Sequence, residues 1–187
     1  MDTNKLITNA RNFLTERVQS LEKDVRYCIV RNENTPDWPA PFPALLYCFS
    51  TIDLLGSLYG GDAKSSSKIS ERSLNYMTDI MSYPKDKAKL IQKIFRHKLV
   101  HLAQPMPSQK IRGIKYRWKY YHDNLSQHLK LDNIGDNNTE QLSISIVTLA
   151  DDISTSVFKP NGYLQRLEKD PDLQRNFETA YKQIIED

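Results

Sequence analysis

The chain has 187 residues and a net charge of +3, from 26 Lys and Arg against 23 Asp and Glu. This length suits one domain with a sizeable core, so we expect residues 1–187 to form a single domain. The mild basic excess permits nucleic-acid binding without requiring it. The absence of an apolar leader or a run of 18 apolar residues argues against a secreted or membrane-spanning protein and favours a cytoplasmic location.

The first half of the chain predicts helices. Apolar residues recur every three or four positions from Thr3 to Val30, which indicates a long amphipathic helix. The proline-rich segment from Arg31 to Pro43 has no helical period and is expected to be a loop. The segment from Ala44 to Tyr59 is apolar on almost every side, as a central helix is, and a shorter helix is expected over Ser70 to Met81.

Asp53 is the single charge in the predicted central helix. A buried carboxylate needs a partner, and a structural interpretation is a hydrogen bond or ion pair with a neighbouring helix. A functional interpretation is that Asp53 supports the candidate site by orienting Arg96 or a histidine. The sequence leaves both interpretations open.

The segment from Leu90 to Gln104, LIQKIFRHKLVHLAQ, combines an arginine with two histidines. Wound as an α-helix, it predicts Arg96, His97 and His101 on one polar arc, opposite an apolar stripe that suits a bundle core. Arginine can hold a phosphate through its fork of donors, and histidine can transfer a proton near neutral pH. This segment is therefore the candidate catalytic helix.

The pattern changes to a period of two at residues 114–120. Four large side chains alternate there with three basic ones, namely Ile114, Tyr116, Trp118 and Tyr120 with Lys115, Arg117 and Lys119. This predicts a strand with an aromatic face and a basic face, paired with a short strand at HLKL in a small β-hairpin over about residues 111–131. The basic residues either protect an exposed sheet edge or hold a phosphate backbone whose bases stack on the rings.

Helices are predicted again after the hairpin. One is expected from Leu142 to Val157, and a last one begins at Pro171 with Asp170 as its cap. The expected fold class is therefore mostly α, a bundle of about six helices that carries a small β-hairpin.

Several chemistries are excluded by the motifs that the sequence lacks. It contains no glycine-rich phosphate loop, no G-x-S-x-G, no C-x-x-C and no H-E-x-x-H. His97 and His101 have a metal-ligand spacing but no obvious third ligand nearby, so we expect neither a metal nor a cofactor. What remains is an arginine followed by a histidine at Arg96 and His101, a short pattern that recurs at Arg117 and His122 and therefore depends on its context.

In that context FRHKLVHLAQP resembles the R-x(4-6)-H motif of the HEPN superfamily, whose members are helical nucleotide- and RNA-binding domains. Together with ALLYCFSTIDLLGSLYGG it is also similar to a group of bacterial HEPN-like proteins, and the resemblance covers residues 44–105. It implies a metal-independent endoribonuclease, of the kind used in toxin-antitoxin or antiphage defence. Arg96 would then hold the scissile phosphate, His101 would transfer the proton and His97 would assist.

The resemblance also implies partners. We expect a homodimer whose paired motifs face one cleft, RNA or a nucleotide as ligand, an antitoxin protein as a candidate partner, and no membrane. RNA contacts are expected at Lys93, Lys115, Arg117 and Lys119. Two alternatives stay open: a noncatalytic HEPN-like module that binds RNA or a nucleotide, and a helical dimer that acts through protein interactions.

Overall fold

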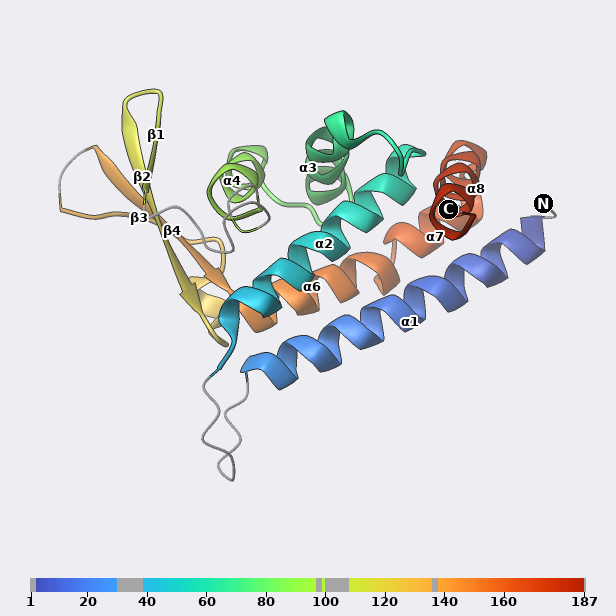
Figure 1. Ribbon diagram of the computed structural model, residues 1–187, viewed down its shortest axis with the longest axis horizontal. Helices are drawn as coiled ribbons and strands as arrows, with labels where there is room; N and C mark the ends of the chain where they lie inside the picture. Colours follow the sequence, from blue (N-terminus) through green and yellow to red (C-terminus); the bar gives the residue numbers. More distant parts are fainter. Residues whose placement is uncertain (1–2, 30–38, 97–98, 100–107, 136–137, 187) are drawn as a thin grey trace. The chain divides into compact units, whose positions relative to one another are not determined.

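The computed structural model describes residues 3–29, 39–96, 99, 108–135 and 138–186 (Figure 1). The chain divides into two compact units. The first comprises Met1–Leu21, Ser50–Lys85 and Asp152–Asp187, and the second comprises Glu22–Phe49 and Asp86–Asp151. The expectation of a single domain stays a prediction.

The described residues are mostly helical, as the sequence predicted. The α-helices are α1 (Thr3–Ile29), α2 (Pro41–Gly60), α3 (Ile69–Asp79), α4 (Lys85–Ile91), α6 (Ile146–Phe158), α7 (Tyr163–Lys169) and α8 (Pro171–Ile185). Short 3-10 turns form at η1 (Ser66–Lys68) and η3 (Leu125–Gln127), and η2 (Gln92–Arg96) is a π-helical turn. The long first helix and the central helix α2 confirm the two strongest helical patterns.

A four-stranded mixed sheet replaces the small hairpin expected over residues 111–131. Its strands are β1 (Ser108–Ile111), β2 (Ile114–Tyr121), β3 (Leu131–Asn133) and β4 (Thr139–Ser145), in the order β1-β2-β4-β3. β2 pairs antiparallel with β1 and parallel with β4, and β3 pairs antiparallel with β4. The predicted partner of β2, the HLKL segment, contributes instead to β3 at the far edge.

The helix predicted from Leu142 begins only at Ile146. Residues before that point form β4, where Leu142 lies opposite Trp118 and Ile144 lies opposite Tyr120. The apolar residues of LSISI fit both a strand period and a helix period. Pairing with β2 satisfies the backbone donors and acceptors of this segment and decides in favour of the strand.

The first unit has an apolar core with a few buried polar groups. The predicted stripe of α1 is buried in this unit at Ala10, Leu14, Val18 and Leu21, whereas its first member, Ile7, is half-buried and Leu6 is buried in its place. Tyr59, Tyr76 and Tyr163 pack edge to face with ring centroids 5.9–6.2 Å apart. The buried hydroxyls of Tyr76 and Ser156 are 2.9 Å apart and share a hydrogen bond.

The second unit packs the aromatic face of the sheet against helical residues. Trp118 and Tyr120 stack at 6.0 Å, and Phe42 of α2 meets both rings edge to face at 6.3 and 5.9 Å. Phe95 of η2 lies 5.9 Å from Trp118 and 6.3 Å from Phe49. This cluster fixes which face of β2 points inward, because aromatic rings bury more area than any other side chains.

By length and composition, α2 is the one helix among the described residues that would be able to cross a membrane. However, 56% of the 18-residue apolar stretch within α2 is buried inside the protein. A buried apolar helix of this kind is compatible with the core of a soluble protein. The cytoplasmic location stays a prediction.

Candidate functional site

Part of the segment predicted to be catalytic is described by the structure. α4 ends at Ile91, and the π turn η2 carries the chain through Phe95, which is buried, to Arg96, which is half-buried. His97 and His101 lie outside the described residues. The shared polar arc of Arg96, His97 and His101 therefore stays a prediction.

The π turn departs from the regular α-helix that the sequence predicted up to Arg96. Hydrogen bonds from i to i+5 close a wider turn than those of an α-helix, so the rotation of 100° per residue does not hold from Gln92 to Arg96. Single π turns occur frequently at functional sites in other proteins. Here the turn ends at the arginine of the candidate motif and contacts β2.

The predicted basic face of β2 is present. Lys115, Arg117 and Lys119 are exposed and alternate with the half-buried residues of the aromatic face. β2 pairs with β1 over residues 114–117 and with β4 over residues 115–121, so protection of a sheet edge does not account for Lys115 and Arg117, which are paired on both sides; it stays an open interpretation for Lys119. The basic residues therefore form an exposed sheet surface.

Lys110 adds a fourth cation that sequence reasoning missed. It lies on β1 directly opposite Lys115, and Ser108 lies opposite Arg117. The strand pair turns at Arg112 and Gly113, both with positive φ (49° and 88°), as two-residue hairpins require. The local signal for this hairpin was the sequence KIRGIK, in which Lys and Ile repeat in reverse order on either side of Arg112 and Gly113. Glycine adopts a positive φ readily, and arginine does so at some cost.

The basic face has a hollow at the hairpin end. It has a volume of about 390 Å³ and is lined by Ser108, Lys110, Gly113, Lys115, Asn138 and Thr139. Two lysines and two hydroxyl-bearing residues are among those that line it, and ammonium and hydroxyl groups can each donate a hydrogen bond to an oxyanion. The hollow is therefore chemically suited to a phosphate group.

The aromatic face is not arranged to stack bases. The rings of Trp118 and Tyr120 are occupied by contacts with Phe42, as described above. Tyr116 is hydrogen-bonded to the Glu140 carboxylate, and burial and that carboxylate together raise its pKa. Trp118 and Tyr120 are therefore not free to stack bases, and the predicted base stacking on β2 is not supported for these two rings.

Lys93 lies on η2 and Asp53 on α2, so neither belongs to the strands that carry the basic face. Lys93 is exposed on η2, which contacts the sheet from the side of Phe95 and Trp118. Asp53 belongs to the first unit, where it accepts a hydrogen bond of 2.5 Å from the Ser73 hydroxyl of α3. That bond is the structural interaction considered for Asp53, and its supporting role toward Arg96 stays a prediction.

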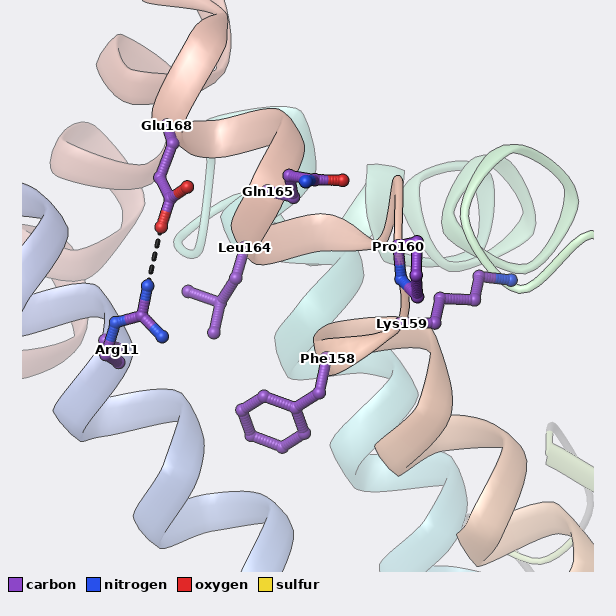
Figure 2. A pocket seen from close by; sticks show the side chains of 7 residues that line it. All are labelled: Arg11, Phe158, Lys159, Pro160, Leu164, Gln165 and Glu168. Carbon is purple, nitrogen blue, oxygen red and sulfur yellow. Dashed lines mark hydrogen bonds and ion pairs between the residues drawn. The ribbon is translucent and has the colours of Figure 1, made fainter.

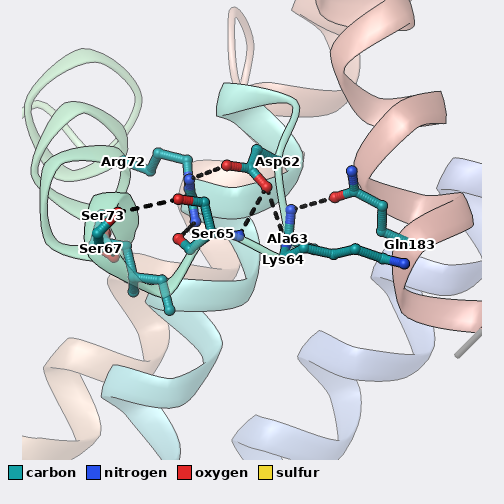
Figure 3. A network of polar contacts seen from close by, with 9 residues as sticks. Asp62, Ala63, Lys64, Ser65, Ser67, Arg72, Ser73 and Gln183 are labelled. Carbon is teal, nitrogen blue, oxygen red and sulfur yellow. Dashed lines mark hydrogen bonds and ion pairs between the residues drawn. The ribbon is translucent and has the colours of Figure 1, made fainter.

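The glycine- and serine-rich loop after α2 is held by a polar network (Figure 3). Arg72, which is buried, donates to Asp62 at 2.8 Å and to the Ser65 carbonyl at 2.8 Å. Asp62 also accepts from the backbone N–H groups of Lys64 and Ser65 at 3.0 Å. The hydrogen bond from Ser65 is the main reason that the pKa of Asp62 lies below its usual range. The negative charge that these donors bind is thus the Asp62 carboxylate of the protein itself.

A second cavity lies in the first unit, between α1, α6 and α7 (Figure 2). It has a volume of about 280 Å³, and Phe158 and Leu164 give it an apolar wall. Arg11 and Glu168 form an ion pair of 2.6 Å on its other side. Because these two charges compensate each other, the cavity is a weaker candidate for an anionic ligand than the basic face.

In the ranges that the structure describes, no three His, Cys, Asp or Glu side chains gather as metal ligands would. No protein-family model, curated protein or solved structure matches the chain. The likeness to the HEPN superfamily therefore rests on the motif and its context, and it stays a prediction.

Proposed function

We propose that the protein binds RNA through the basic face, which we define as Lys110, Lys115, Arg117 and Lys119. The supporting observation is that these four cations share one exposed side of an antiparallel strand pair. Within the described ranges, no carboxylate forms an ion pair with any of them. Unpaired surface cations in register attract a polyanion, and phosphate contacts of this kind dominate affinity for nucleic acids.

The spacing of the cations suits a linear polyanion. Alternate residues on one face of a strand lie about 6.6 Å apart, so Lys115, Arg117 and Lys119 form a row of about 13 Å. Arginine and lysine have different roles in such a row, since Arg117 can bind a phosphate with two donors and a lysine acts as a point charge. RNA is preferred over DNA as the proposed ligand because of the resemblance to the HEPN superfamily.

Binding of a fluorescently labelled RNA at several salt concentrations tests this proposal. Neutralising three residues with Lys115→Gln, Arg117→Gln and Lys119→Gln is expected to weaken binding roughly tenfold or more and to reduce the slope of log affinity against log salt by about 2 to 3. A matched control, Lys5→Gln, Lys23→Gln and Lys68→Gln, removes the same charge from exposed positions elsewhere. Equal affinities of the two triple variants would overturn the proposal.

We further propose that Arg96, His97 and His101 cleave the bound RNA without a metal ion. The observation that favours this second function is the π turn that ends at a half-buried Arg96. Attack of a 2′-hydroxyl on the adjacent phosphate needs a proton acceptor, a proton donor and stabilisation of the developing charge. Histidine and arginine provide these functions.

Cleavage of end-labelled RNA in EDTA tests the second function. Wild-type protein is expected to produce ends with a cyclic phosphate, whereas folded His101→Ala protein is expected to leave the RNA intact. If neither protein cuts RNA that the wild type binds, the noncatalytic binding module is the better description. If wild-type protein also fails to bind RNA, the helical protein-interaction component replaces both proposals.

The homodimer and the antitoxin partner also remain proposals. Both follow from the HEPN resemblance, and a role in toxin-antitoxin or antiphage defence depends on them. Light scattering of the purified chain is expected to give a mass of twice 21.7 kDa. A mass of one chain across the micromolar range would contradict a stable dimer.

A further inference from the structure

Whether the bound RNA is single-stranded or base-paired is a separate question from the charge that attracts it. Proteins that bind single strands combine a basic groove with aromatic rings on which successive bases stack. Proteins that bind an RNA duplex instead contact phosphates and 2′-hydroxyls, because the bases are stacked on each other and face inward. The two forms therefore require different side chains on the binding surface.

The basic face lacks open rings among the described residues. Tyr116, Trp118 and Tyr120 point to the opposite side of β2, where Phe42 packs against the rings of Trp118 and Tyr120 and Glu140 accepts a hydrogen bond from the Tyr116 hydroxyl. His122 continues that row and stacks on Tyr120 at 6.1 Å. An aromatic residue of β2 does share the basic face, but the Lys119 ammonium lies 4.8 Å from the centroid of its ring, that of Tyr121.

The hollow supplies the second observation. Lys110 and Lys115, which line it, are directly opposite each other, and like charges in that arrangement repel. The repulsion is relieved when an anion binds between the two ammonium groups. Ser108 and Thr139 line the same hollow, and their hydroxyls can donate to further oxygens of that anion.

Resting on the proposed RNA binding, we infer that the ligand of the basic face is a base-paired RNA, held by its phosphate backbone with one phosphate in the hollow. The row of Lys115, Arg117 and Lys119 then follows neighbouring phosphates of the duplex. Arg112 extends this surface, because it is exposed at the turn next to the hollow. Recognition depends on charge and hydroxyl contacts, so it is independent of base sequence.

Competitive binding in the His101→Ala background tests this inference without cleavage. The probes are a 20-base-pair RNA duplex, one strand of that duplex alone, and the DNA duplex of the same sequence. The sequence is chosen so that the single strand cannot fold back or pair with itself. We expect the RNA duplex to bind at least tenfold more tightly than the single strand at equal salt. The double variant Lys110→Gln and Lys115→Gln is expected to remove most of that preference, whereas Lys5→Gln and Lys23→Gln keeps it.

The outcomes separate this inference from the proposed function. Equal or tighter binding of the single strand, still dependent on Lys115 and Arg117, would overturn the duplex inference and leave RNA binding in place. Equal binding of the DNA duplex would overturn the assignment to RNA. No salt-sensitive binding of any probe would overturn the proposed function itself. Circular dichroism melting of each variant confirms that the fold is retained.

Discussion

Lys110 of β1 and Lys115 of β2 occupy directly opposite positions on the exposed side of the sheet. A pair of like charges in this position destabilises a sheet by about 0.2–1 kcal/mol. Both residues also line the hollow that suits a phosphate. The like-charge pair thus lowers the stability of the free protein at the position where a bound phosphate would relieve the repulsion.

Replacing Lys110 with glutamine is expected to raise the free energy of unfolding by about 0.2–1 kcal/mol and to weaken RNA binding. Urea denaturation at low salt measures the first effect, and titration of labelled RNA measures the second. Arg117→Gln is the control for stability, because its neighbours Ser108 on β1 and Gln141 on β4 carry no charge. A loss of stability in Lys110→Gln would contradict the like-charge explanation.

The two faces of β2 are expected to separate stability from binding. Trp118→Ala removes a ring that contacts Phe42 and Phe95, so it should lower the free energy of unfolding by about 3 kcal/mol. Arg117→Gln, one residue earlier, should change it by less than about 0.5 kcal/mol but weaken RNA binding. Thermal melts and binding titrations of both variants provide the comparison, and a large stability loss in Arg117→Gln would count against the assigned faces.

The faces of β2 were predictable because a period of two is a local pattern. The alternation of Lys115, Arg117 and Lys119 with larger side chains gave the correct strand and the correct two sides. Its position in the sheet was not predictable in the same way. The parallel neighbour β4 begins at Thr139, and the local sequence does not specify a pairing over that distance.

Two other differences between the elements predicted from the sequence and those in the structure have physical reasons. Leu142 was assigned to a helix because its distance to Ile146 is four residues, yet the strand ladder with Trp118 determines its conformation. The π turn at Gln92–Arg96 has the composition of an ordinary helix, so propensity does not predict it, and Phe95 within the turn packs against Trp118 and Phe49. The first residue of the candidate motif, Arg96, therefore lies at the end of a turn that regular helical geometry did not predict.

Gly56 is expected to be required for the packing of α2 against α3. A Cβ atom there would lie 2.8 Å from the Ser73 nitrogen and 2.9 Å from the Arg72 carbonyl carbon, and backbone atoms cannot move aside cheaply. Gly56→Ala should lower the free energy of unfolding by about 1–3 kcal/mol. Gly60→Ala is the comparison, because its Cβ would meet side-chain atoms of Arg72 and no backbone; Arg72 can move aside only by weakening its hydrogen bonds to Asp62 and Ser65, so a smaller loss is expected. Urea denaturation of both variants measures the difference, and equal losses would contradict the backbone explanation.

Asp62 is expected to make stability depend on acid pH. Its pKa lies below the ordinary value of 3.8, chiefly because of the hydrogen bond from the Ser65 backbone N–H. The folded state therefore binds this proton less readily than the unfolded state, so the contribution is complete above pH 3.8 and is lost as the pH falls through the lower, folded-state pKa. Melting temperatures of wild-type protein and Asp62→Asn should differ at pH 6 and converge toward pH 3. A constant difference across that range would show that Asp62 does not titrate in this way.

Binding and cleavage are expected to respond to different substitutions. The basic face points away from the side of β2 on which Trp118 contacts Phe95, and Arg96 follows Phe95 in the same turn. Neutralising Lys115 and Arg117 should therefore raise KM about tenfold or more with little change in kcat, because it removes contacts made equally in the ground state and the transition state. His101→Ala should lower kcat by at least about 100-fold with binding retained.

Steady-state and single-turnover kinetics on one RNA distinguish these effects. Lys5→Gln with Lys23→Gln serves as the charge-matched control and should leave both constants unchanged. If neutralising the basic face lowers kcat as much as His101→Ala does, the face contacts the reacting phosphate, and binding and cleavage belong to a single site. A selective effect on KM would instead support a basic face that holds the RNA at a distance from the bond that is cut.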